Sequence, residues 1–298
     1  MALSGGSPPK ATADNPEKTH MPLDFDRWLA HPKIDMHCHV WRMDDPADEA
    51  RSAEALIAAG DMLGISEYWC SSPVIGGRLA NPDEVRAEND AVLRAMRAFP
   101  DRIRGWCFVI PGHYRQAVDE VHRCLDEGMV GIKLYNQYRL DDPAVCPVIE
   151  AAVERRVPVL EHAGYIETPE LRAQQPLISD GRHFAAVNRR YPEAALIHAH
   201  TGGGGIWEQT LRAMRGTSAN LYCDISGSNL DDGQVEMSVA ELGPGRVLFG
   251  TDGTMAGSVG KVIDATVDDA VKRAIFWDNA ARLLADQGAA PLHPGAPA

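Results

Sequence analysis

The chain lacks any apolar run close to the roughly 20 residues that a membrane-spanning helix needs. Its first residues also lack the apolar centre of a secretion signal and are rich in Gly, Ser, Pro, Ala and Lys. We therefore expect a disordered leader over 1–22. No linker composition interrupts the rest, so we predict one folded domain over 23–290 and a flexible tail over 291–298.

Basic residues are also scarce, because 29 Lys and Arg face 42 Asp and Glu, for a net charge of −13. This balance argues against a nucleic-acid groove or an anionic membrane surface. The 6 cysteines show no paired motif spacing, which fits reduced thiols in a cytoplasmic protein. We expect a small-molecule substrate as the partner and a homo-oligomeric assembly.

Short apolar runs alternate with longer amphipathic segments along the chain after residue 30. The runs predict strands over 34–40, 65–70, 105–110, 130–135, 157–162, 195–200, 220–225 and 247–252. The segments predict helices over 83–99, 114–127, 143–156, 182–191, 206–215, 232–242, 265–275 and 279–287. The count and length match a (β/α)8 barrel. A doubly wound sheet would alternate too, but no Gly-x-Gly-x-x-Gly follows the first strand.

Chemically useful side chains stand where several of these strands end. His37 and His39 lie two residues apart, so in a strand both imidazoles point to one face. Three later strands each end in a single residue that could bind a metal: His162, His200 and Asp252. All carboxyl ends of barrel strands meet on one face, where active sites lie. The sequence therefore predicts a metal or catalytic site there.

These motifs resemble the amidohydrolase superfamily, and more narrowly the amidohydrolase-2 branch that includes aminocarboxymuconate-semialdehyde decarboxylase. The matching motifs are Asp35-x-His37-x-His39, Gly131-Ile132-Lys133-Leu134-Tyr135, His162-Ala163-Gly164, His200-Thr201-Gly202-Gly203, Leu248-Phe249-Gly250-Thr251-Asp252 and Asn279-Ala280-x-Arg282-Leu283. The resemblance implies a TIM barrel with its metal site at the carboxyl ends of the strands.

By this resemblance, His37, His39, His162 and Asp252 would hold one divalent metal. Three imidazoles and a carboxylate suit Zn²⁺, with Mn²⁺ as the alternative, and leave room for a water whose pKa the metal lowers to about 7. Asp252 would accept a proton, and His200 would stand beside the water or polarise the substrate.

Lys133 leaves two alternatives open. If carboxylated, as in some members of the superfamily, it would bridge two metals; we favour a mononuclear site in which its ammonium meets a substrate anion. Tyr135, Tyr138 and Arg139 are expected to line the substrate pocket.

Strand alternation gives three further expectations. Asp35 shares the parity of His37 but lies deeper, where a carboxylate could hold a metal-ligating histidine. His198 shares the parity of His200 and is expected to point inward, as a core histidine with a hydrogen-bond partner. Glu161 is expected to point outward to a partner such as Arg.

Three functions remain open at this point. A metal-dependent hydrolase of an ester, lactone or amide comes first, because metal, Asp252 and His200 together suit attack by water. A non-oxidative decarboxylase or another lyase of the same branch comes second. A barrel that binds a metal or ligand without catalysis comes third.

Overall fold

The computed structural model describes residues 24–201 and 206–294. The expected leader over 1–22, the glycine run 202–205 and the last residues of the expected tail, 295–298, lie outside this part. No helix among the described residues is long and apolar enough to cross a membrane.

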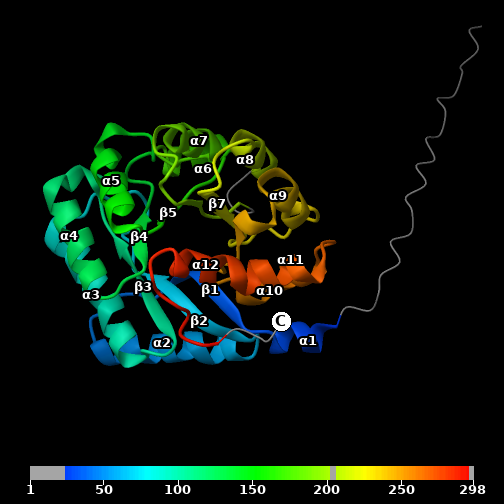
Figure 1. The fold of residues 1–298 in the computed structure, drawn as a ribbon. Helices are drawn as coiled ribbons and strands as arrows, with labels where there is room; N and C mark the ends of the chain where they lie inside the picture. Colours follow the sequence, from blue (N-terminus) through cyan, green and yellow to red (C-terminus); the bar gives the residue numbers. More distant parts are fainter. Residues whose placement is uncertain (1–23, 202–205, 295–298) are drawn as a thin grey trace, which may run out of the picture.

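Eight parallel strands follow one another around a barrel, in the order of the sequence (Figure 1). They are β1 (Lys33–His39), β2 (Ile65–Ser71), β3 (Ile103–Phe108), β4 (Gly131–Leu134), β5 (Val159–Glu161), β6 (Leu196–His198), β7 (Leu221–Asp224) and β8 (Val247–Leu248). Met36 N donates to Phe249 O, and Asp252 N to His37 O, so the segment after β8 joins β1 and closes the barrel. The predicted (β/α)8 barrel is confirmed.

Helices surround the strands (Figure 1). They are α1 (Phe25–Ala30), α2 (Pro46–Asp61), α3 (Pro82–Ala98), α4 (Arg115–Asp126), α5 (Cys146–Arg155), α6 (Pro169–Gln174), α7 (Gly181–Arg190), α8 (Trp207–Met214), α9 (Gln234–Leu242), α10 (Met255–Asp264), α11 (Asp269–Arg273) and α12 (Asn279–Ala285). The sequence prediction missed α1, α2, α6 and α10, and placed one helix over 265–275, where α11 is short. The buried face of α2 consists of Ala53, Ile57 and Gly60, which is too small to give a strong apolar period.

Apolar side chains form two layers, one inside the barrel and one between strands and helices. The inner layer contains Trp69 and Trp106, which pack with Met36, Leu160 and Leu248. The outer layer joins the other faces of the strands to the helices. The inner layer fills the lower barrel, so any polar site must lie above it, where the strands end.

Candidate functional site

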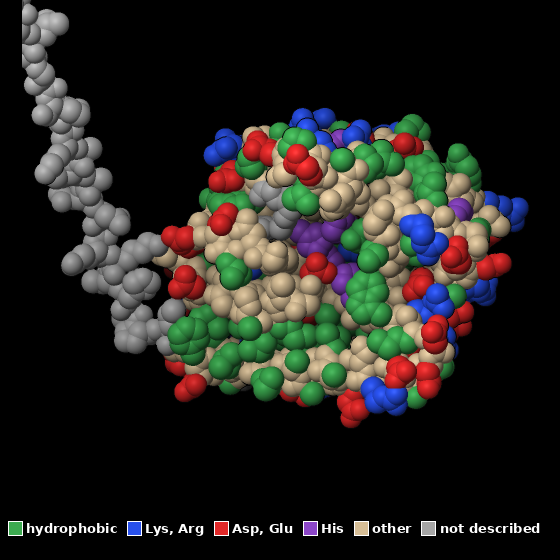
Figure 2. All heavy atoms as spheres, turned by 180° about the vertical axis from the view of Figure 1, so that it is seen from behind, with side chains coloured by type: hydrophobic (Ala, Val, Ile, Leu, Met, Phe, Trp, Pro, Cys, Tyr) green, Lys and Arg blue, Asp and Glu red, His purple; other side chains and the backbone are tan. Residues whose placement is uncertain are grey.

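Histidine side chains gather in a hollow near the middle of one face of the molecule (Figure 2). A cavity of about 160 Å³ opens there, and its lining includes His162, His200, Gln175 and Asp252. These residues follow β5, β6 and β8, so the cavity lies at the carboxyl ends of the strands. This is the expected place for the site.

A bulge in β1 directs His37 and His39 into the site. Asp35 pairs with Tyr68 and Cys38 with Cys70, so three steps along β1 match two along β2. The extra residue breaks the alternation: Met36 packs in the inner layer, whereas Cys38 packs in the outer one. Cys38, which stands between the two histidines in the sequence, therefore points away from the site.

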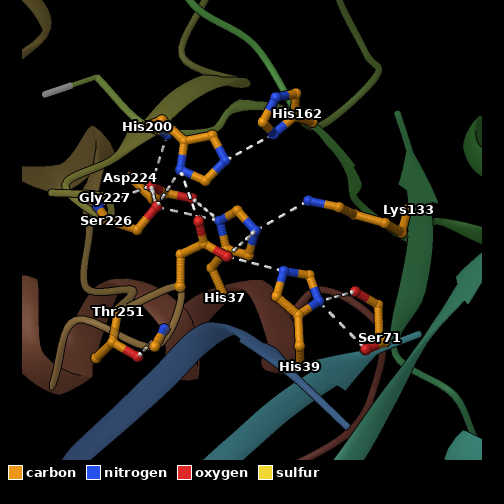
Figure 3. A network of polar contacts seen from close by, with 12 residues as sticks. His37, His39, Ser71, Lys133, His162, His200, Asp224, Ser226, Gly227 and Thr251 are labelled. Carbon is orange, nitrogen blue, oxygen red and sulfur yellow. Dashed lines mark hydrogen bonds and ion pairs between the residues drawn. The ribbon is translucent and has the colours of Figure 1, made fainter. Parts of the chain in front are cut away.

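His37 is held by a carboxylate that sequence reasoning missed. Its Nδ1 lies 2.8 Å from Asp224 Oδ2, and both side chains are buried. Asp224 can only accept when ionised, so Nδ1 carries the proton and Nε2 keeps its lone pair. That lone pair faces the ammonium of Lys133, whose Nζ lies 2.9 Å away (Figure 3).

His39 and Asp252 face each other across the site. His39 Nδ1 lies 3.2 Å from the backbone oxygen of Ser71, which can only accept, and 3.1 Å from Ser71 Oγ, which can also donate. The opposite nitrogen, Nε2, lies 2.8 Å from Asp252 Oδ1. Burial lowers the pKa of His39, which disfavours a second proton on the ring. At this distance a proton on Nε2 is donated to the carboxylate, and a divalent metal held by both groups would take the place of that proton.

The donor set of this cluster fits a divalent metal. Ligand atoms of His37, His39 and Asp252 lie within 4.8 Å of one another. Two imidazole nitrogens with a carboxylate oxygen are ligands that Zn²⁺ and Mn²⁺ accept. Burial alone would raise the pKa of Asp252, but its hydrogen bond with His39 and the nearby His37 and His200 outweigh burial and hold it well below its usual range.

His162 and His200 form a second part of the site, beside the cluster. His162 Nδ1 lies 2.9 Å from His200 Nε2, and His162 Nε2 lies 3.0 Å from Gln175 Oε1. His200 Nδ1 lies 3.6 Å from Asp252 Oδ2. Burial lowers the pKa of His162 to about 3 and that of His200 well below its usual value, so both rings are neutral at pH 7. The structure therefore brings the predicted residues together, with His162 next to His200.

Two of these residues adopt a backbone conformation that side chains disfavour. The φ angle is +58° at His200 and +48° at Asp252. Asp224 Oδ1 fixes the first of them, because it accepts from His200 N at 3.0 Å. Such conformations persist where the surroundings impose them, and they concentrate at functional sites.

Asp224 and Ser226 link the two parts of the site. Ser226 Oγ lies 2.6 Å from Asp224 Oδ1, 2.9 Å from His200 Nδ1 and 3.2 Å from His37 Nδ1. The sequence does carry a signal for Asp224, since it is a polar residue at the end of an apolar run, like the other site residues.

The expectations from strand alternation failed for two residues. His198 packs against Phe184 of α7, with ring centroids 4.7 Å apart, and neither of its nitrogens has a hydrogen-bond partner in the described part of the chain. Asp35 does not contact a histidine ring: it accepts from Thr251 N and Oγ1 and from His37 N. Glu161 does point outward, but its partner is the hydroxyl of Ser179 at 2.8 Å, not an arginine.

Aromatic rings stack on two of the site histidines. Tyr135 stacks on His162 with centroids 4.1 Å apart, and Trp41 stacks on His39 at 5.0 Å. Tyr138, the other tyrosine expected to bind substrate, packs instead against the small apolar cluster that contains Phe108. Arg139 lines a neighbouring cavity.

Comparison with known proteins identifies the family. A family model described as amidohydrolase matches residues 34–285. The chain belongs to the amidohydrolase family. No curated protein matches this amidohydrolase.

Solved structures share the fold of this amidohydrolase at low identity. 2,6-dihydroxybenzoate decarboxylase from Rhizobium is 16% identical, with a TM-score of 0.67 over 85% of this chain and 98% of that chain. 5-carboxyvanillate decarboxylase from Sphingomonas paucimobilis is 19% identical, with a TM-score of 0.65 over 85% and 98%. Dihydroxybenzoic acid decarboxylase from Polaromonas sp. JS666, solved with manganese and 2-nitroresorcinol, is 18% identical, with a TM-score of 0.64 over 85% and 96%.

Proposed function

We propose that this amidohydrolase is a metal-dependent, non-oxidative decarboxylase of a hydroxylated aromatic acid. His37, His39 and Asp252 would hold the divalent ion. His162, the fourth ligand predicted from the sequence, would join them if it gave up its contact with His200. When bound, the metal supplies positive charge that holds substrate oxygens and stabilises negative charge developing on the ring. Manganese in the decarboxylase from Polaromonas makes Mn²⁺ as good a candidate as Zn²⁺.

The observation that carries the proposal is the buried ammonium of Lys133. Burial lowers its pKa to about 8, so it stays largely charged at pH 7. Its only hydrogen bond within the described chain is to His37, which leaves donors free. A buried charge needs a partner, and a substrate carboxylate would supply one.

The walls of the site support an aromatic substrate. The rings of Trp41 and Tyr135 flank the histidines, and aromatic rings favour stacked or edge-on contacts with one another. Solved decarboxylases of hydroxylated benzoates share the fold, which adds to the support.

Asp252 and His200 are the groups placed to relay a proton to the substrate. When the carbon–carbon bond breaks, CO₂ leaves and its electron pair stays on the ring carbon, which then needs one proton. The low pKa of Asp252 keeps it ionised at pH 7, so the proton must come from solvent; Asp252 would take it up and pass it to the ring carbon, with His200 at 3.6 Å holding the water.

Hydrolysis of an ester, lactone or amide is the second candidate. Its support is that Asp252, which its low pKa keeps ionised, could accept a proton from an attacking water.

Product analysis separates the candidates. The purified protein, loaded with Mn²⁺ or Zn²⁺, is incubated with a panel of hydroxybenzoates and a panel of aryl esters and lactones. We expect CO₂ and the matching phenol in equal amounts, and loss of turnover in Asp252→Asn. A new carboxylate without CO₂ would make the protein a hydrolase. Metal binding without turnover of either panel would favour the non-catalytic barrel.

A further inference from the structure

A second cavity adjoins the site and is larger than it. This outer pocket of about 350 Å³ is lined in part by Arg139, Arg172, Arg182 and His183. It shares Ile166, Gln175 and Ile178 with the cavity around His162, His200 and Asp252. Its volume lies within the range of small-molecule sites.

Two arginines give the outer pocket an uncompensated positive charge. Arg172 donates through Nε and Nη2 to Ile166 O, and Arg139 through Nη2 to Pro176 O. In the part of the chain that the structure describes, neither forms an ion pair. Arg182 differs, because its Nη2 lies 2.7 Å from Asp180 Oδ2.

Both arginines keep donors for a ligand. A guanidinium has five N–H groups, and backbone contacts occupy only some of them here. In a chain with a net charge of −13, two unpaired arginines beside a cavity are a local exception that an anion would match.

The wall between the two cavities is a short loop held from both sides. Gln175 Oε1 lies 3.0 Å from His162 Nε2 and accepts from Asn136 Nδ2 at 2.9 Å. The next residue, Pro176, is the one that Arg139 holds. A molecule with its reacting end at His162 would therefore have its far end beside the arginines.

We propose that the outer pocket binds a second anionic group, carboxylate or phosphate, at the far end of the substrate. The substrate class would then be a hydroxylated aromatic acid with a second anionic group at its far end. This inference rests on the proposed function for the reacting end, but its test needs no turnover.

The test compares binding of matched probes to the metal-loaded protein at constant ionic strength. Calorimetry is run on dicarboxylates and ω-phosphonocarboxylates of increasing length, each against the monocarboxylate of equal length. At one length we expect the dianion to bind about tenfold tighter or more, since charge-assisted bonds to arginine are strong. The tighter of the two dianions identifies the terminal group.

Variants assign the gain to the two arginines. Arg139→Gln with Arg172→Gln should bring dianion affinity to within about threefold of the monoanion affinity measured on the same variant. Arg189→Gln removes an exposed arginine from α7 outside the pocket and should keep the full gain.

Two results would overturn the subsite: no dianion exceeds its monoanion at any length, or the gain survives the double variant. If the wild type binds a dianion more tightly than its monoanion but releases no CO₂ from any acid, the decarboxylase proposal is refuted and the subsite stands. CO₂ release from a monoanion with no dianion gain would do the reverse.

Discussion

Replacing Asp224 by Asn should cost metal affinity through the tautomer of His37. One side of the carboxylate accepts from His200 N at 3.0 Å and Ser226 N at 2.9 Å. An Asn oxygen can keep these bonds, so the amide NH₂ must face His37 Nδ1. Two donors would then meet, unless His37 moves its proton to Nε2. With Nε2 protonated, the lone pair that would bind the metal is lost.

The size of the loss follows from what the carboxylate does. Partners that orient a metal-ligating histidine are typically worth about 10- to 100-fold in metal affinity, or about 1.4–2.7 kcal/mol. Turning the amide around does not avoid the loss, because its NH₂ would then face the N–H groups of His200 and Ser226, which now donate to Asp224. We therefore expect the upper half of that range.

The assay is competition with a chelator of known affinity, using Mn²⁺ and Zn²⁺ separately. Asp35→Asn is the matched control: it also removes a buried carboxylate beside the site, but this carboxylate contacts Thr251 and a backbone N–H, not an imidazole. Burial raises the pKa of Asp35 to about 7, so its neutral form is already accessible. If folded Asp224→Asn binds metal within about threefold of the wild type, the argument from the tautomer is wrong.

Three further changes have expected outcomes. Gly250→Ala would place a Cβ 2.7 Å from the Cβ of His37, so we expect a loss of about 1–3 kcal/mol in unfolding free energy and weaker metal binding. Its control is Gly260→Ala, whose Cβ would meet nothing within 4 Å and should stabilise the protein by up to about 1 kcal/mol in chemical denaturation. An equal loss in both would contradict the steric argument. Burial lowers the pKa of Lys33 from 10.5 to about 7, so between pH 7 and pH 10.5 the unfolded chain binds more protons than the folded one. As the pH rises through this window, the unfolding free energy of the wild type should increase relative to that of Lys33→Met by up to about 1.4 kcal/mol per pH unit. A difference that does not change with pH would refute this. Lys133→Met should raise KM for the acid about tenfold without lowering metal content from one equivalent; a fall from two equivalents to one would instead indicate a carboxylated lysine.

Most of the fold could be predicted because strands of a barrel are short apolar runs with polar ends. The two longer helices that escaped prediction, α2 and α10, did so for different physical reasons. The buried side of α2 is small, and α10 contains Gly257 and Gly260, which suggest a loop. In α2 the many Ala and Glu residues favour a helix, but the apolar period is weak. In α10 the two glycines lower the helix propensity, and packing on the barrel stabilises the helix.

The site could be predicted as a set of residue types but not as a set of directions. Alternation places side chains only along a regular strand, and it fails at a bulge or at a residue with positive φ. β1 has its bulge between Asp35 and Cys38, and the chain after β6 has positive φ at His200. For this reason His37 reaches the site although Met36 already faces inward, and His200 reaches it although His198 faces the helices. The same irregularities that defeat the parity argument bring the ligand atoms together, since two adjacent inward residues cannot come from a regular strand. In a regular strand His198 would point to the same side as His200. Because the chain turns at His200, His198 packs on α7 instead, and Asp224 of β7 is the residue that contacts His200.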